Sequence, residues 1–537
     1  MQLITRFFVL FALLTLALSA PTAIPTFGAV RTHAAANATT NSTTSASDNS
    51  TATSASNNSI AASASDNSTA TSASNNSTAS QLPSSTPSSP VGATVNNNSV
   101  SALNKTTQMS GMDSSNGTEL LLPDDDPFYR APNNTGDYKP GEVIRYRKVR
   151  SPGYITNLNG NISATYQVLF RSSDNFDKAT AAMTTVLIPH NANVTKLLSY
   201  QNIMDSSATK CAPSYTLRLS EASQPLEIVE STFLQAALNE GWVVNVPDYE
   251  GPEAAFTVGK QSGQTTLDSV RAVLNLGDMT GIKEPPTVSL WGYSGGTIGT
   301  IWAAELQDTY APELKIAGAA AGGITPNLTE IAVRLNNSTH VGIAFSALHG
   351  LSAQYPEFKK VIEDDLYPEK REDYMKGKNM CIDEVAFYNQ QDWTTYFKSG
   401  AKLLEHPVVN KVMDENSMGK STPKIPMFWY DGPQDDIGDY NTITKLMEDF
   451  CADGGNILLH EDLTARHTPL AVLGSKDAFS WLKNIMDGIG MKDGCRKESF
   501  LSNALTPGSM DVFGEQLGDR LVQMYPQIEQ NQGNTAL

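Results

Sequence analysis

After residue 165, segments with the pattern of strands alternate with segments with the pattern of helices. Runs rich in branched and aromatic residues, typical of strands, cover residues 165–170, 182–188, 242–246, 287–291, 425–430 and 457–459. Apolar residues at helical spacing cover residues 227–238, 265–277, 297–306, 441–451 and 477–486. Because parallel strands need a crossover, usually a helix, this order predicts an α/β fold with a mostly parallel sheet covered on both faces. Residues 323–421 break the alternation and predict an inserted helical cap.

The composition divides the chain into a leader, a linker and one folded domain. Residues 1–19 combine a positive start with an apolar run too short to span a bilayer, which predicts a signal peptide. Residues 34–118 consist mainly of Ser, Thr, Asn and Ala, and the string at 45–59 recurs at 63–77. This segment lacks the apolar surface needed to offset the entropy of folding, so we expect a disordered, glycosylated linker. Residues 123–537 form the predicted folded domain.

The composition also limits partners and chemistry. The net charge of −18 argues against nucleic-acid binding, which depends on basic residues, and no second apolar run predicts a transmembrane segment. Cys211, Cys381, Cys451 and Cys495 are an even set without a CxxC spacing, so an exported chain is expected to hold two disulfides, with three possible pairings, and no zinc. Sequons inside the predicted domain, which would need surface positions, begin at Asn161, Asn193, Asn327 and Asn337.

The motif Gly292-Tyr-Ser294-Gly-Gly296 carries the clearest chemical signal. A predicted strand enters it and a predicted helix leaves it, which is the arrangement of a nucleophile elbow. The glycines give room for a sharp turn at Ser294, and the helix start directs backbone N–H groups toward a developing oxyanion. The alternative is a glycine-rich turn with an inert serine. We interpret Ser294 as the nucleophile.

A serine nucleophile needs a histidine base and an acid, which follow in the order Ser, Asp or Glu, His in a fold of this kind. His467 lies after the predicted strand at 457–459 and before the last predicted helix, whereas its rival His460 adjoins the strand itself. Asp435 and Asp436 are equally good acids by spacing, with Asp431 behind them.

Several spaced motifs resemble the fungal secretory lipase family over about residues 123 to 500. They are Ser199-Tyr-Gln with Asp205, Cys211-Ala-Pro-Ser-Tyr215, Val246-Pro-Asp-Tyr-Glu-Gly-Pro252, Gly259-Lys-Gln-Ser-Gly263, the serine motif, Asp435-Asp-Ile437 with Tyr440, and Cys451-Ala-Asp-Gly-Gly455.

The resemblance implies an α/β-hydrolase fold with a helical cap and a C-terminal flap, for which residues 490–512 are the candidate. It implies Ser294 as nucleophile, His467 as base and Asp435 as acid. It implies an oxyanion hole of the Gly295 N–H and Asp205, and the disulfides Cys211–Cys381 and Cys451–Cys495. In place of the family's Glu, this chain has Asp436, and Gly438-Asp439 replaces a Val-Pro-like pair.

We therefore expect a secreted triacylglycerol lipase that acts on lipid or ester substrates at an oil–water interface and needs no cofactor or metal. A carboxylesterase or peptidase would share the same three residues, and activity on emulsified versus soluble esters would separate them. A non-enzymatic glycosylated surface protein, suggested by the repeats, would leave Ser294 unlabelled by a fluorophosphonate. The segment at 34–118 is expected to be a stalk, a cell-wall tether or a processed propeptide.

Overall fold

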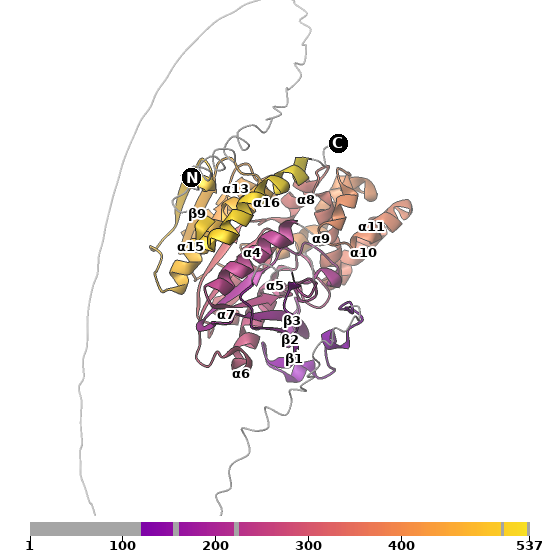
Figure 1. The fold of residues 1–537 in the computed structure, drawn as a ribbon. Coiled ribbons are helices and arrows are strands. Elements are labelled where there is room, and N and C mark those ends of the chain that lie inside the picture. The colour runs from indigo at the N-terminus through magenta and orange to yellow at the C-terminus, as the bar shows by residue number, and fades with distance from the viewer. Residues whose placement is uncertain (1–119, 154–159, 220–224, 506–509, 534–537) are drawn as a thin grey trace, which may run out of the picture. The chain divides into compact units, whose positions relative to one another are not determined.

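The computed structural model describes residues 120–537, apart from residues 154–159, 220–224, 506–509 and 534–537 (Figure 1). The predicted signal peptide (1–19) and the predicted linker (34–118) lie outside the described residues. Among the helices that are described, none has the length together with the hydropathy that crossing a membrane requires.

A ten-stranded sheet lies at the centre of the described chain, in the order β1-β2-β3-β5-β4-β6-β7-β8-β9-β10. The strands are Val143–Val149 (β1), Ala164–Ser173 (β2), Ala179–Ile188 (β3), Asn193–Gln201 (β4), Trp242–Pro247 (β5), Thr287–Tyr293 (β6), Ile316–Gly322 (β7), Met427–Asp431 (β8), Ile457–Asp462 (β9) and Arg496–Phe500 (β10). The first three strands pair antiparallel, as do β3 and β5, and every neighbouring pair from β5 to β10 is parallel. The predicted mostly parallel sheet is confirmed.

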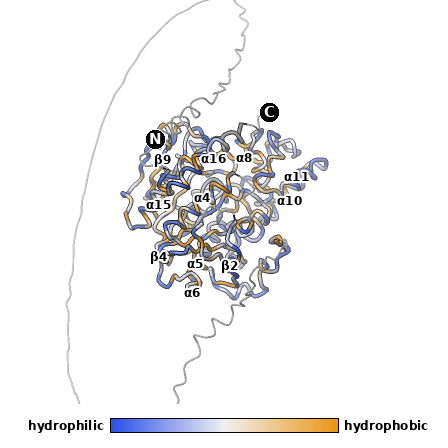
Figure 2. The backbone as a smooth tube through the Cα atoms, viewed as in Figure 1, coloured by the Kyte–Doolittle hydropathy of each residue, from blue (hydrophilic) through white to orange (hydrophobic). Residues whose placement is uncertain are grey.

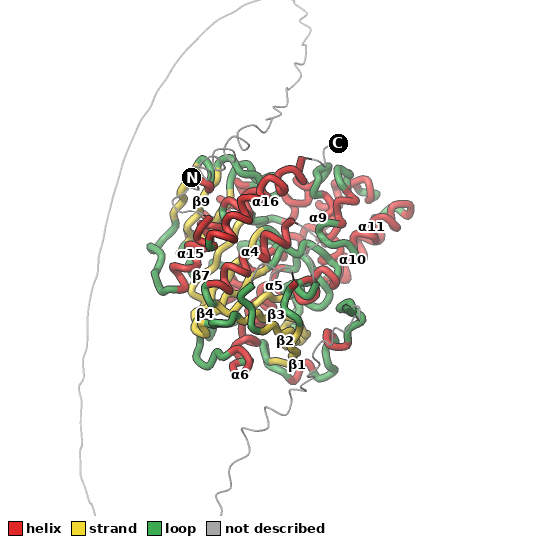
Figure 3. Tube along the Cα trace, in the orientation of Figure 1, coloured by secondary structure: helices red, strands yellow, loops and turns green. Residues whose placement is uncertain are grey.

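Helices cover both faces of this sheet because alternate strand residues point into two separate apolar layers. In β8, Met427 and Trp429 enter one layer, whereas Phe428 and Tyr430 enter the other. The first layer includes residues of α5 (Gly259–Leu274), α7 (Gly296–Tyr310) and α13 (Tyr440–Ala452). The second includes residues of α4 (Pro225–Asn239), α14 (His467–Leu473), α15 (Ser475–Met486) and α16 (Glu515–Gly533). Helices α4 and α16 lie side by side over the strands (Figure 3).

Strand β7 lies in the middle of the parallel part, although its sequence, Ile-Ala-Gly-Ala-Ala-Ala-Gly, has little strand propensity and did not predict a strand. Its small residues are required by its neighbours. A Cβ on Gly318 would lie 2.6 Å from the Trp481 ring, and one on Gly322 would lie 2.3 Å from the Tyr430 ring. Packing against large aromatic side chains therefore decides the composition of this strand. Strands β1 and β4 were not predicted either.

The segment predicted as a flap, 490–512, contributes β10, which runs parallel to β9 at the edge of the sheet. The sequence did not predict this strand because Arg-Lys-Glu-Ser-Phe has no apolar alternation. Its three central residues are exposed, and charged side chains are typical of an edge strand that does not pair with another chain. Part of the predicted flap, 506–509, lies outside the described residues.

Between β7 and β8 the chain leaves the sheet to form a helical insertion, defined here as residues 323–426, where the sequence predicts a cap. Its helices are α8 (Leu328–Leu335), α9 (Val341–Gln354), α10 (Pro356–Asp365), α11 (Arg371–Gly377) and α12 (Pro407–Asn416), joined by short 3₁₀ turns. Side-chain caps fix several starts: Asn327 Oδ1 accepts the Thr329 and Glu330 N–H groups at the start of α8. Helices α10 and α11 carry mostly hydrophilic residues (Figure 2).

The four cysteines form two disulfides, Cys211–Cys381 and Cys451–Cys495. The first joins the segment after β4 to the insertion, and the second joins the end of α13 to the residue before β10.

The four predicted glycan acceptors differ in accessibility. Asn193 and Asn337 are exposed, whereas Asn161 and Asn327 are half-buried. The Asn161 Nδ2 atom, to which a glycan would attach, donates a hydrogen bond to the Leu238 carbonyl at 2.9 Å. Occupancy at Asn161 would therefore break an existing contact.

Several carboxyl groups are buried in the body of the domain. Burial raises the pKa of Glu230 to about 8, against the opposing effect of hydrogen bonds from Ile203, Tyr200 and Asn202. Burial likewise raises the pKa of Asp248 and of Glu305 to about 7. The Glu305 carboxylate, on α7, accepts the backbone N–H groups of Gly419, Lys420 and Ser421 at the end of the insertion.

We expect the free energy of unfolding to fall as the pH rises from about 5 to about 8. A buried acid whose folded pKa is raised stabilises the fold fully below its unfolded pKa, and this contribution is lost as the pH rises through its folded pKa. Urea unfolding across this range should show a steeper loss of stability for the wild type than for the Glu230→Gln/Glu305→Gln variant. Parallel pH dependences for the two proteins would contradict the assignment.

Candidate active site

Ser294 sits on the sharp turn between β6 and α7 with a φ of 51°, in the left-handed region that residues other than glycine rarely adopt. Its N–H donates to the Gly322 carbonyl at 2.9 Å, at the end of β7. The turn is crowded: a Cβ on Gly292 would lie 2.4 Å from Thr300 Oγ1, and one on Gly296 would lie 2.1 Å from the Gln201 carbonyl oxygen. The glycines of the motif are therefore needed for the turn that exposes the Ser294 hydroxyl to the cavity described below.

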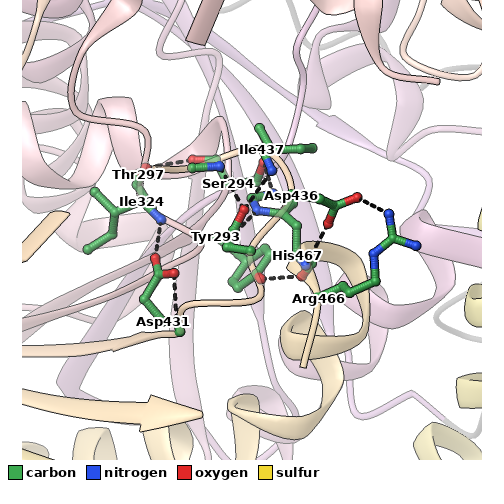
Figure 4. A network of polar contacts seen from close by, with 12 residues as sticks. Tyr293, Ser294, Thr297, Ile324, Asp431, Asp436, Ile437, Arg466 and His467 are labelled. Carbon is green, nitrogen blue, oxygen red and sulfur yellow. Dashed lines mark hydrogen bonds and ion pairs between the residues drawn. The ribbon is translucent and has the colours of Figure 1, made fainter. Parts of the chain in front are cut away.

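The His467 imidazole lies between Ser294 and a carboxylate. Its Nε2 atom is 2.8 Å from Ser294 Oγ, and its Nδ1 atom is 2.7 Å from Asp435 Oδ2. His467 begins α14, directly after the loop that follows β9, and the Tyr293 hydroxyl donates to its backbone carbonyl (Figure 4). His467 is 3% exposed and Asp435 is 1% exposed, so bulk water is kept from both partners of this hydrogen bond. The arrangement is that of a serine, base and acid relay.

The structure shows which of the three candidate acids, Asp431, Asp435 and Asp436, contacts the His467 ring. Asp435 Oδ1 accepts the N–H groups of Ile437 and Gly438, at 2.8 and 2.6 Å, which leaves Oδ2 for His467. Asp436 instead accepts the backbone N–H of His467 at 3.1 Å and pairs with Arg466 at 2.5 Å (Figure 4).

Asp431 and His460 are turned away from the relay. Asp431 accepts the Ile324 N–H at 2.8 Å, at the start of the insertion (Figure 4). The His460 Nδ1 atom lies 3.3 Å from Asp477 Oδ2 on α15. These contacts give both residues structural partners outside the serine, base and acid arrangement.

The charges around His467 favour its protonated form. Burial lowers the pKa of His467, but the negative charges of Asp435, Asp436 and Asp431 raise it, and the net pKa is about 9. The same carboxylates would stabilise an imidazolium if the neutral ring accepted a proton from Ser294.

Asp205 lies directly beside Gly295, the residue that precedes α7. A Cβ on Gly295 would lie 1.6 Å from Asp205 Oδ1, so the carboxyl packs against the Gly295 backbone. Asp205 has a φ of 44°, is 2% exposed, and its Oδ1 atom is buried without a hydrogen-bond partner. Burial raises the pKa of Asp205 to about 6, although the nearby His467 lowers it. A neutral carboxyl here is a hydrogen-bond donor beside the N-terminus of a helix, the chemistry of an oxyanion site.

An apolar pocket begins at these residues and is lined further on by residues of the insertion. Ser294, Gly295 and Asp205 line it, together with aliphatic residues of the insertion. These aliphatic residues include Leu328, Leu335, Ile343, Ala347, Leu348 and Leu351. The cavity provides an uncharged space of the kind that binds a hydrocarbon chain next to the serine hydroxyl.

In the described part of the chain, one group of possible metal ligands meets in space: Cys381, Asp383 and Glu384. The Cys381 sulfur is bonded to Cys211, and Glu384 pairs with Lys210 at 2.8 Å. These partners fit a structural role rather than a cation site.

Sequence reasoning missed three residues that hold the site together. Glu230 on α4 accepts the Ile203 N–H at 2.8 Å, Tyr293 donates to His467, and Arg334 on α8 donates to the Asp435 carbonyl. Tyr293 lies inside the serine motif, so its place beside Ser294 could be predicted from the sequence. The contacts of Glu230 and Arg334 depend on tertiary structure alone.

Comparisons with known proteins identify the family of the chain. The model of the secretory lipase family matches residues 219–494. Lipase A of Arthroderma benhamiae is 38% identical over 413 residues, which cover 75% of this chain and 88% of that protein. Lipase 1 of Candida albicans is 36% identical and covers 72% of this chain and 85% of its own length.

The X-ray structure of Candida antarctica lipase A in its closed state superposes with a TM-score of 0.69 at 29% identity, covering 75% of this chain and 96% of that one. A Legionella pneumophila protein with 14% identity and a TM-score of 0.54 shares the fold. With its α/β-hydrolase fold and this extent of sequence identity, the chain belongs to the secretory lipase family.

Proposed function

We propose that the chain is a triacylglycerol lipase that acts outside the cell through an acyl-enzyme on Ser294. The observation that carries this proposal is the hydrogen-bonded series Ser294–His467–Asp435 beside an apolar pocket that Ser294 lines. The two relatives described above are named lipases, which supports a lipid ester as substrate.

In the first half of the reaction, His467 Nε2 takes the proton of Ser294 Oγ as that oxygen attacks the ester carbonyl carbon. Asp435 keeps the other ring nitrogen protonated and stabilises the imidazolium. The carbonyl oxygen becomes an oxyanion beside the Gly295 N–H and the Asp205 carboxyl. His467 then gives its proton to the leaving alcohol, and an ester of Ser294 remains.

In the second half, His467 takes a proton from water as the water oxygen attacks the acyl-enzyme. The same oxyanion site holds the second tetrahedral intermediate, and its collapse returns the proton to Ser294 and releases the fatty acid. The protein's own groups account for every proton moved in these steps.

Exposed apolar side chains near the site support action at an oil–water interface. Val333 of α8 is 61% exposed, Leu463 is 41% exposed, and Leu501 is 48% exposed. Val333 adjoins Arg334, which contacts Asp435, and Leu463 belongs to the loop that leads to His467. The secretory family, together with the signal peptide expected at 1–19, supports an extracellular location, and a cell-wall tether is proposed for residues 34–118.

We expect Ser294→Ala to lower kcat/KM by about 10⁴-fold or more on both emulsified long-chain triacylglycerol and a soluble butyrate ester, because the nucleophile is lost. Ser289→Ala, in the strand β6 that leads to Ser294, is the matched control, since that hydroxyl is buried without a partner. Retained activity in Ser294→Ala would overturn the mechanism. Serine-dependent turnover of the soluble ester alone would indicate a carboxylesterase.

We expect filling the cavity to change the acyl preference. Ala347→Leu adds bulk to the cavity wall on α9, and should lower kcat/KM for long-chain esters about tenfold more than for a butyrate ester. Ala353→Leu, exposed on the same helix, should leave the ratio unchanged. Equal effects on the two chain lengths would show that the acyl chain does not occupy this cavity.

We expect the ratio of kcat/KM for the wild type to kcat/KM for Asp205→Asn to fall by about tenfold or more as the pH rises through about 6. Burial raises the pKa of Asp205 to about 6. Below this pKa the carboxyl is neutral and can donate to the oxyanion, and above it the carboxylate only accepts. The asparagine amide donates at every pH. The ratio of kcat/KM values from about pH 5 to about pH 8 measures the effect, and a constant ratio would contradict it.

A further inference from the structure

The segment that carries Asp205 is held in place by contacts with other parts of the chain. We define the oxyanion loop as residues 202–212. Asp205 holds a left-handed backbone with a φ of 44°, and its Oδ1 atom makes no hydrogen bond. The carboxyl is thus placed by the loop backbone and by packing on Gly295, so whatever holds the loop also places the carboxyl.

The sheet side of the domain fastens the beginning of this loop. The buried Glu230 carboxylate accepts the Ile203 N–H at 2.8 Å and the Asn202 Nδ2 group at 3.1 Å. The Tyr249 hydroxyl donates to the Asn202 carbonyl at 2.9 Å. These contacts fix Asn202 and Ile203, which precede Asp205. The residues after Asp205 are held by other contacts.

The helical insertion fastens the rest of the loop, by three different kinds of contact. Ser206 Oγ donates to the Met380 carbonyl at 2.7 Å, and Lys210 pairs with Glu384 at 2.8 Å. The Cys211–Cys381 disulfide joins the same two segments covalently, across 170 residues of sequence. All three contacts connect residues 206–211 to residues 380–384, so the insertion and the oxyanion loop meet at one place.

We propose that the Cys211–Cys381 disulfide is a positioning element of the oxyanion hole, which holds Asp205 against Gly295 through the oxyanion loop. This inference rests on the proposed function, in which Ser294 is the nucleophile. Displacement of an oxyanion group lowers transition-state stabilisation without loss of ground-state binding, so the disulfide acts on kcat more than on KM. The second disulfide, Cys451–Cys495, joins α13 to the segment before the edge strand β10 and packs against a different apolar cluster from Cys211 and Cys381.

The test compares the two disulfides in the full chain on a soluble butyrate ester, which makes little use of the acyl cavity. Cys211→Ser/Cys381→Ser should lower kcat by about tenfold to a hundredfold with little change in KM. Cys451→Ser/Cys495→Ser should retain kcat. Fluorophosphonate titration counts folded active sites, and thermal unfolding shows how much stability each variant has lost. An equal loss of kcat in the two variants would overturn the proposal.

A double-mutant cycle identifies the route of the effect. If the disulfide acts through Asp205, its removal in the Asp205→Ala background should cost little further kcat. A loss as large as in the wild-type background would overturn the proposal. If Asp205→Ala itself retains kcat while Ser294→Ala abolishes it, the proposed function stands and the disulfide proposal fails.

A second variant covers the case in which loss of the disulfide prevents folding. Ser206→Ala/Lys210→Gln removes the hydrogen bond and the ion pair to the insertion and keeps both disulfides. It should lower kcat by a smaller factor that again disappears in the Asp205→Ala background. An unchanged kcat in this variant would contradict the proposed coupling between the insertion and the oxyanion loop.

Discussion

The site depends on one constraint: neighbouring parallel strands end at the same edge of a sheet. The segments after β4, β6, β8 and β9 carry Asp205, Ser294, Asp435 and His467 respectively. Ser294, His467 and Asp435, which are far apart in sequence, therefore meet within hydrogen-bond distance, and Asp205 packs against Gly295. The crowded turn at Ser294 then orients the proposed nucleophile, and each of the other segments has only to bring one side chain to it.

A site residue could be predicted from the sequence where its role depends on a local pattern. Ser294 and His467 could be proposed because a glycine-flanked turn and a position after a strand are local patterns. Asp435 and Asp436 are adjacent and chemically identical, and only the tertiary contacts with Ile437, Gly438 and Arg466 decide which carboxylate faces the imidazole. The family resemblance, rather than spacing, favoured Asp435.

The fold shows the same limit. The sequence predicted six of the strands and missed β1, β4, β7 and β10. The compositions of β7 and β10 depend on the residues that surround them. In β7 the small residues make room for Trp481 and Tyr430, and in β10 the charged residues face solvent at an edge. Neither composition can be interpreted as a strand without knowing what lies beside it.

The insertion contacts the site at two places, through Arg334 at the Asp435 carbonyl and through Cys381 at the oxyanion loop. Such an insertion cannot be exchanged between relatives as an independent module. A chimeric protein with the insertion of a relative would have a different apolar pocket. It would also need residues equivalent to Arg334 and Cys381 to keep Asp435 and Asp205 in place. During divergence, the interior of the insertion is therefore freer to change than these two points of attachment.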